Sequence, residues 1–326
     1  MTQNTIVING VPVYVDSAAL ISLLSNQKKP SPLMSEYVNQ WFESFKKKKL
    51  RPRTQVTYDS LIRTHIKPFF GDKPVGDIDV STIQQFYDSK NGLSKSTVRQ
   101  CKILLHQIFN AAIEDNLIDH NPTESVRLTY SGRVTERQAL TQLEIKDVIR
   151  QMVRLKGSDH RLLAIMIYTG VRRGEACGLR WEDIDFDSNM IHIKRAVSFV
   201  ANQPLVGQTK SKAGIRDIPL LPELKAILEP YRREKGYLVG RGEEPVTERA
   251  YICAFNRIIK KMDLHGATAH IFRHTFLTMA MDVVDLKTLQ TIAGHSSHVV
   301  TMRYVHKRDE KVVEAGQKLA GMFNAS

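Results

Sequence analysis

The chain has 326 residues, a length that predicts two domains, and its 42% hydrophobic and 25% charged residues are typical of globular proteins. The longest apolar run, Leu162 to Tyr168, is far too short to cross a bilayer, so no membrane protein and no membrane partner are expected. Lys and Arg number 47 against 34 Asp and Glu, a net charge of +13 that favours nucleic acid as a polyanionic partner.

The cysteines and the first residues point to a cellular compartment. Cys101, Cys177 and Cys253 lie far apart and form no Cys-x-x-Cys pair. This usage fits a reducing environment and argues against a cysteine-based zinc site. No secretory signal is visible at the N-terminus. We therefore expect a cytoplasmic protein.

Residues 1–30 are predicted to form a short N-terminal arm. The Asn9-Gly10 pair separates two β-branched runs, which predicts a β-hairpin. A short helix is expected around Ala18 to Leu24. The two prolines in Lys28 to Pro32 then indicate a linker.

Residues 35–128 are predicted to form an all-α domain of four helices. Apolar residues recur at the spacing of one buried helix face in four stretches: Val38 to Phe45, Tyr58 to Ile66, Ile83 to Tyr87, and Val98 to Ala112. A basic run, Lys46 to Arg53, lies between the first two helices. On its own this run could be a solvated helix end, but beside the net charge it favours contacts with phosphates.

Residues 138–326 are predicted to form a second, α+β domain. Thr141 and Glu144 have the spacing of a helix-capping box. Two helices are expected first, then three short strands and further helices. The strands are predicted at about Met190–Val197, Pro204–Gln208 and Ile215–Pro219, with residues 209–214 as the turn between the last two.

The segment Tyr168 to Glu175 is a candidate anion site. Thr169-Gly170 interrupts an apolar helix, and Arg172 then falls near the N-terminus of the next one. Free backbone N–H groups and a guanidinium would converge there on an anion, with Glu175 holding one arginine. The alternative is an exposed arginine that pairs locally with Glu175.

A second candidate is His270-Ile271-Phe272-Arg273-His274, which places His270, Arg273 and His274 on one helix face. Histidines at i and i+4 are also a zinc spacing, so a zinc hydrolase is an alternative. The positive charge of Arg273 on that face would repel a cation and favours a phosphate instead. A plain surface helix is the third alternative.

These motifs continue toward the C-terminus in a fixed order. Gly294-His295-Ser296-Ser297 precedes Thr301 to His306, which contains Tyr304. The whole series resembles the tyrosine recombinase family, particularly phage and mobile-element integrases, over roughly residues 35–310. Two departures are Ala293, where the family usually has Leu, and an arm shorter than the usual accessory-site domain.

The resemblance implies an activity and a set of site residues. It implies a site-specific DNA recombinase that cleaves and rejoins DNA through a 3′-phosphotyrosine, without metal, ATP or other cofactor, for integration or excision of a phage or mobile element. Residues 35–128 would be its core DNA-binding domain, and 138–326 its mainly α catalytic domain with a small antiparallel sheet. The site residues that it implies are Arg172 and Arg273 as phosphate clamps, Lys210 or alternatively Lys212 as the hairpin lysine, His270, His295, and Tyr304 as nucleophile.

The resemblance also implies partners and leaves alternatives open. The implied partners are double-stranded DNA, three further copies of the chain in a homotetramer, and a directionality factor or host DNA-bending protein, all at the bacterial nucleoid. A non-catalytic DNA-binding relative would show the same charge, and a nuclease or type IB topoisomerase would share the chemistry.

Overall fold

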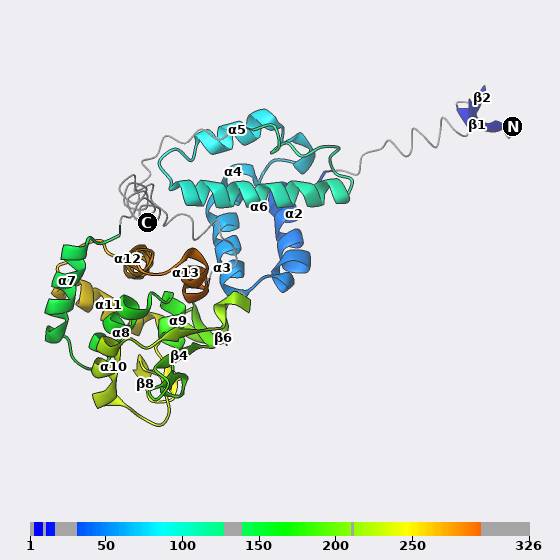
Figure 1. The fold of residues 1–326 in the computed structure, drawn as a ribbon. Coiled ribbons are helices and arrows are strands. Elements are labelled where there is room, and N and C mark those ends of the chain that lie inside the picture. The colour runs from blue at the N-terminus through cyan, green and yellow to red at the C-terminus, as the bar shows by residue number, and fades with distance from the viewer. Residues whose placement is uncertain (1–2, 9–10, 17–30, 127–138, 210–211, 295–326) are drawn as a thin grey trace, which may run out of the picture. The chain divides into compact units, whose positions relative to one another are not determined.

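The computed structural model describes residues 3–8, 11–16, 31–126, 139–209 and 212–294, and it divides the chain into two compact units, Met1–Thr135 and Glu136–Ser326. We call them unit 1 and unit 2, and describe each by itself (Figure 1). In unit 1 the predicted hairpin is confirmed: β1 (Gln3–Ile8) pairs antiparallel with β2 (Val11–Asp16), and Ile8 lies opposite Val11. The helix expected around Ala18 falls outside the described residues.

Residues 31–126, the other described part of unit 1, are mainly helical and include all four stretches that the sequence predicts as helices. Its helices are α2 (Met34–Gln40), α3 (Pro52–Leu61), α4 (Lys67–Phe70), α5 (Val80–Asp88) and α6 (Lys95–Glu114). Asp79 and Ser94 accept hydrogen bonds from backbone N–H groups in the first turns of α5 and α6 and so begin these helices. Their apolar faces meet in one core that contains Phe70, Phe86 and Phe109.

One helix face in unit 1 was predicted wrongly. Phe45, expected beside Trp41 and Phe42 on the buried face, is 62% exposed. The chain from Trp41 to Lys46 is π-helical, with hydrogen bonds from i to i+5 rather than i to i+4. A wider turn shifts each later residue around the helix axis, so Phe45 turns toward solvent.

Unit 2 is built around α8 (Gly157–Thr169), which packs against α9 (Arg173–Gly178), α10 (Pro222–Leu228), α11 (Glu248–Lys261) and α12 (Ala269–Ala280). Residues 162–167 of α8 are all buried, as expected for a helix that is apolar on every side. The other α-helices in the described part of unit 2 are α7 (Gln142–Gln151), where the predicted Thr141–Glu144 capping box is confirmed, and α13 (Leu286–Ala293). Within the described residues, no helix is long and apolar enough to cross a membrane.

The strands of unit 2 form small antiparallel sheets. They are β3 (Ile184–Asp185), β4 (Met190–Ile193), β5 (Arg195–Val200), β6 (Gln203–Gln208), β7 (Arg216–Pro219), β8 (Gly240–Arg241) and β9 (Glu244–Pro245). One sheet has the order β3-β4-β7, and β5-β6 and β8-β9 are separate pairs. The α+β class with small antiparallel sheets is thus present in unit 2.

Two strand predictions need correction. The single strand expected at Met190–Val197 is two strands, β4 and β5, which meet at Lys194 and belong to different sheets. The segment 209–214 was expected to close a hairpin between the last two strands. It instead connects β6, which pairs with β5, to β7, which pairs with β4. The term hairpin lysine for Lys210 or Lys212 is therefore wrong for this connection.

Candidate active site

The loop between α8 and α9 holds Arg172 in place. Helix α8 ends at Thr169, and its C-cap, Gly170, adopts a left-handed conformation with φ +59°. Arg172 is then the N-cap residue of α9, and its backbone N–H donates to Glu175 Oε2 at 2.9 Å. The Arg172 side chain donates from Nη1 to Glu175 Oε1 at 2.7 Å. The predicted position of Arg172 near a helix N-terminus, and its contact with Glu175, are both confirmed.

Glu175 is a buried carboxylate between two arginines. Its side chain is 3% exposed, and Oε2 also accepts from Arg216 Nη2 at 3.0 Å. Burial by itself raises the pKa of Glu175. The hydrogen bond and charge of Arg216, together with those of Arg172, outweigh burial and hold this pKa below its usual value. Glu175 is therefore ionised at neutral pH and fixes both guanidinium groups.

Arg273 reaches the same place from α12. The residue is 4% exposed, and it donates from Nη1 to the carbonyl oxygen of Gly170 at 2.8 Å and from Nη2 to that of Ala293 at 2.7 Å. The first of these acceptors belongs to the loop that carries Arg172, so α12 and this loop are tied together. The second belongs to the last residue of α13.

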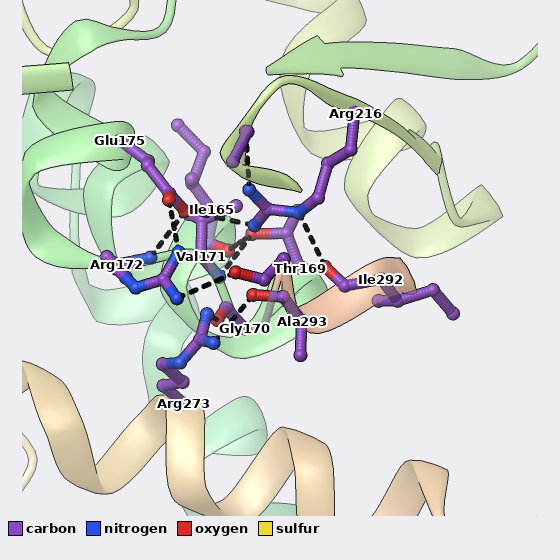
Figure 2. A network of polar contacts seen from close by, with 12 residues as sticks. Ile165, Thr169, Gly170, Val171, Arg172, Glu175, Arg216, Arg273, Ile292 and Ala293 are labelled. Carbon is purple, nitrogen blue, oxygen red and sulfur yellow. Dashed lines mark hydrogen bonds and ion pairs between the residues drawn. The ribbon is translucent and has the colours of Figure 1, made fainter. Parts of the chain in front are cut away.

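Three arginines converge on the end of α13. The carbonyl oxygens of Ile292, Ala293 and Gly294 accept hydrogen bonds from Arg216, Arg273 and Arg172, at 2.7, 2.7 and 3.0 Å respectively. Figure 2 shows the guanidinium groups gathered around this helix terminus. The last carbonyls of a helix have no partner within it and carry partial negative charge, so cations are favourable there. We call this cluster the arginine cluster: Arg172, Arg216, Arg273 and Glu175.

The structure brings some of the predicted site residues together and leaves others outside its described part. Arg172 and Arg273, far apart in sequence, bind carbonyls of adjacent residues, and His295 follows Gly294 directly in the chain. His270 lies exposed at the start of α12, and His274 Nδ1 lies 3.2 Å from the hydroxyl oxygen of Thr278. Lys210, His295 and Tyr304 fall outside the described residues, as does the side chain of Lys212.

The zinc alternative would need a third ligand near His270 and His274. Among the described residues, no group of three or more His, Cys, Asp or Glu side chains lies close enough to hold a metal. Arg273, between the two histidines in sequence, is buried against backbone carbonyls. On α12, His270 is exposed and His274 is partly buried, and Arg273 between them is buried and bound to backbone carbonyls.

Sequence reasoning missed Arg216. The predicted strand began at Ile215, which is in fact exposed and lies outside β7. In β7 the buried residues are Arg216 and Ile218, and they alternate with exposed Asp217 and Pro219. The period-2 pattern through Ile218 and Leu220 would have placed Arg216 on the buried face, and a charged residue there was the signal to follow.

The chain matches two family models. That of the Phage integrase family matches residues 138–311, more than half of the chain, and that of the Phage integrase, N-terminal SAM-like domain, matches residues 33–91. A tyrosine recombinase XerC-like protein of Caldanaerobacter subterraneus subsp. tengcongensis is 25% identical over 331 aligned residues, which cover 89% of this chain and 83% of the relative. A putative prophage phiRv2 integrase of Mycobacterium tuberculosis is 26% identical over 309 residues, covering 90% and 80%.

Solved structures show the same fold. The Tn1549 transposon integrase in complex with a circular intermediate DNA has a TM-score of 0.74 at 22% identity, covering 87% of this chain and 98% of that one. A lambda integrase tetramer bound to a Holliday junction has a TM-score of 0.67 at 17% identity, covering 92% of each chain. With the matched family model and the ordered motifs, these findings identify the chain: it belongs to the phage integrase family and is a site-specific DNA recombinase of the tyrosine type.

Proposed function

We propose that this chain cleaves and rejoins duplex DNA for integration or excision of a phage or mobile element, with Arg172 and Arg273 as the groups that bind the scissile phosphate. The observation that carries this proposal is the meeting of these two arginines at adjacent carbonyls, directly before His295. Each arginine is held by fixed acceptors. A guanidinium held in this way is ready to bind phosphate without reorganising.

Arg172 and Arg273 would contribute differently to binding of the scissile phosphate. The side chain of Arg172 is 37% exposed, although Nη1 and Nη2 already bind Glu175 and Gly294. Arg273 is buried and ties the Arg172 loop to α13. Together they would offset the charge on the nonbridging oxygens of the five-coordinate transition state, a task that many phosphoryl-transfer enzymes give to a metal ion.

The remaining roles follow from residue chemistry. The Tyr304 hydroxyl oxygen would attack the scissile phosphorus, giving a bond to the 3′-phosphate and breaking the bond to the 5′-oxygen. His270 would accept the tyrosine proton, Lys210 would give a proton to the leaving 5′-oxygen, and His295 would complete the site. The 5′-hydroxyl of a partner strand reverses these steps, so the phosphodiester is restored without ATP.

Unit 1 supplies a basic segment suited to a DNA partner. Lys47 pairs with Glu43 at 2.7 Å, and Gln55 Nε2 donates to the carbonyl oxygens of Lys47 and Leu50 at 2.9 and 3.0 Å. These bonds fix the turn that presents exposed Lys48 and its neighbours. We assign residues 35–128 to core-site binding and 138–326 to catalysis, with this turn contacting phosphates.

Assembly and location extend the proposal. The lambda integrase relative is described as a tetramer bound to a Holliday junction. Exchange of four strands needs four nucleophiles, so we propose a homotetramer on two duplexes, at the bacterial nucleoid in the cytoplasm. A directionality factor or a DNA-bending host protein would set the direction of the reaction.

The test removes single hydroxyl groups. Tyr304→Phe should abolish the covalent protein–DNA adduct on denaturing gels and leave DNA binding close to wild type. Tyr251→Phe is the matched control: the Tyr251 hydroxyl is buried and has no hydrogen-bond partner among the described residues, so its loss should leave the adduct intact. An adduct formed by Tyr304→Phe would contradict the assignment. Relaxation of supercoiled DNA without strand exchange would favour a topoisomerase.

A further inference from the structure

Arg216, at the start of β7, is almost completely buried, which is uncommon for arginine. Its side chain is 3% exposed and donates three hydrogen bonds. Nε binds the carbonyl oxygen of Ile292 at 2.7 Å, Nη1 that of Gly214 at 3.0 Å, and Nη2 binds Glu175 Oε2 at 3.0 Å. The acceptors belong to three segments, namely the end of α13, the turn before β7 and the first turn of α9. A planar guanidinium can serve all three, whereas an ammonium group is a compact point charge.

The first connection runs from Arg216 through Glu175 to Arg172. Glu175 Oε2 accepts from Arg216 and from the backbone N–H of Arg172, while Oε1 accepts from the Arg172 side chain. One carboxylate therefore sets the orientation of both guanidinium groups. Without Arg216, Glu175 would lose a buried counter-charge and one of the bonds that fix its rotamer.

The second connection runs through α13. Helix α13 packs against β7, and Arg216 binds the carbonyl oxygen of Ile292, two residues before the carbonyl that Arg172 binds. Gly294 ends the helix with φ +62°, and a Cβ there would lie 2.9 Å from Arg216 Nη1. Arg216 and the helix terminus are therefore packed with no room between them. The position of Gly294, which is the second acceptor of Arg172, depends on this contact.

We propose that Arg216 is a positioning residue for strand cleavage, which holds Arg172 in its phosphate-binding orientation from two sides. The inference rests on the proposed function of Arg172. Arg216 acts through Glu175 and through the end of α13, and its burial keeps it away from DNA. Its third bond holds the carbonyl of Gly214, four residues after Lys210 in the sequence.

A stabilising role alone does not account for this arrangement. Buried ion pairs contribute little net stability compared with apolar side chains of similar volume. A Leu or Met at the buried start of β7 would serve a purely structural purpose. An arginine with three acceptors around the Arg172 side chain is instead suited to orienting that side chain.

The test uses the full-length chain and a nicked duplex carrying its core site, which is first mapped by sequencing the covalent adducts of the wild type. Single-turnover cleavage and half-site affinity are measured separately. Arg216→Met should slow cleavage by about 10²-fold, the cost of misplacing a catalytic group by roughly 1 Å, while the half-site affinity stays close to wild type. Arg216→Lys keeps the charge beside Glu175 and should recover part of the rate.

A second substrate separates positioning from general damage. A duplex with a methyl group in place of one nonbridging oxygen of the scissile phosphate lacks that charge and depends less on Arg172. If Arg216 acts through Arg172, then Arg216→Met should lose less rate on this duplex than on ordinary DNA. Arg172→Met should show the same pattern.

The control breaks another ion pair of unit 2 whose carboxylate is buried. Arg195, whose side chain is 25% exposed, pairs with Asp183, whose side chain is 2% exposed and which lies outside the arginine cluster. Arg195→Met should lower the melting temperature and leave cleavage of both duplexes close to wild type. A deficit in Arg195→Met equal to that of Arg216→Met would show that loss of any arginine from a buried carboxylate of unit 2 has this effect, and would overturn the proposal.

Other outcomes are equally decisive. Wild-type cleavage by Arg216→Met, or an equal deficit on both duplexes, would refute the positioning role. If Arg216→Met fails to fold, Arg216→Lys decides: a rate deficit that is smaller on the methyl-substituted duplex supports the role, and wild-type behaviour refutes it. A wild-type chain that forms no covalent adduct would refute the proposed function, and this inference with it.

Discussion

Replacing Gly170 by alanine should damage both the stability of unit 2 and its chemistry. Gly170 has φ +59°, and an added Cβ would lie 2.3 Å from Phe276 Cδ1 and 2.8 Å from its Cγ. A left-handed alanine costs about 1–2 kcal/mol, and the forced shift of a packed ring costs about 1–3 kcal/mol more. The expected loss in the free energy of unfolding is therefore about 2–5 kcal/mol.

Gly157 provides the matched control at the other end of α8. Its φ, +58°, is nearly that of Gly170, but an added Cβ would meet nothing within 4 Å. Gly157→Ala should therefore cost only the backbone share, about 1–2 kcal/mol. The difference between the two variants measures the collision with Phe276.

The assay can follow unit 2 alone. The chain has two tryptophans, Trp41 in unit 1 and the buried Trp181 in unit 2, so a Trp41→Phe background leaves one fluorescent reporter in unit 2. Urea titrations then give the loss for each glycine variant. Because Gly170 also accepts the hydrogen bond of Arg273, cleavage by Gly170→Ala should fall by about 10²-fold. Equal stability losses in the two variants, or wild-type cleavage by Gly170→Ala, would refute the reasoning.

Three further predictions concern charge. Glu175→Gln should lower the free energy of unfolding by about 3–5 kcal/mol at pH 7. The pKa of Glu175 is lower in the folded chain than in the unfolded chain. The stability that its ionised form contributes is therefore present above the unfolded-state pKa and is lost as the pH falls through the folded-state pKa. Urea titrations should show a smaller difference in the free energy of unfolding between wild type and Glu175→Gln at pH 3 than at pH 7. Lys48→Ala should flatten the slope of log affinity against log salt by about 1, and Lys47→Ala by less because Lys47 already forms an ion pair; equal changes would argue against phosphate contacts at this turn. Lys210→Ala should cleave slowly but recover when the leaving 5′-oxygen is replaced by sulfur, whereas Lys212→Ala should mainly weaken binding; recovery with Lys212→Ala alone would exchange their roles.

Sequence patterns predicted the elements that depend on local contacts. Helix α6 follows its apolar spacing, and the Thr141–Glu144 box begins α7 as expected. Phe45 was misplaced because period 3.6 does not describe the π-helical turn that begins at Trp41. Nothing in the local composition marks that change of hydrogen bonding.

The break between β4 and β5 escaped prediction for a different reason. Ile191, Ile193, Val197 and Phe199 are all buried at odd positions, and Arg195 between them is partly buried, so the period of two keeps its phase across Lys194. Only pairing with distant strands reveals the break, since β4 pairs with β7 and β5 with β6. The candidate site shows the same limit: motifs pointed to Arg172, Arg273 and the local partner Glu175, but the other acceptors of the two arginines are backbone carbonyls of distant segments.

The end of α13 binds its three arginines through the main-chain oxygens of residues 292–294. Such contacts are indifferent to which side chains residues 292 and 293 carry, provided that they fit the space. These contacts require a fixed number of residues, because one insertion would rotate each carbonyl by about 100° away from its arginine. The amino-acid sequence at residues 292 and 293 can therefore change during evolution, provided that no residue is inserted or deleted. An unusual residue such as Ala293 is compatible with an unchanged arginine cluster.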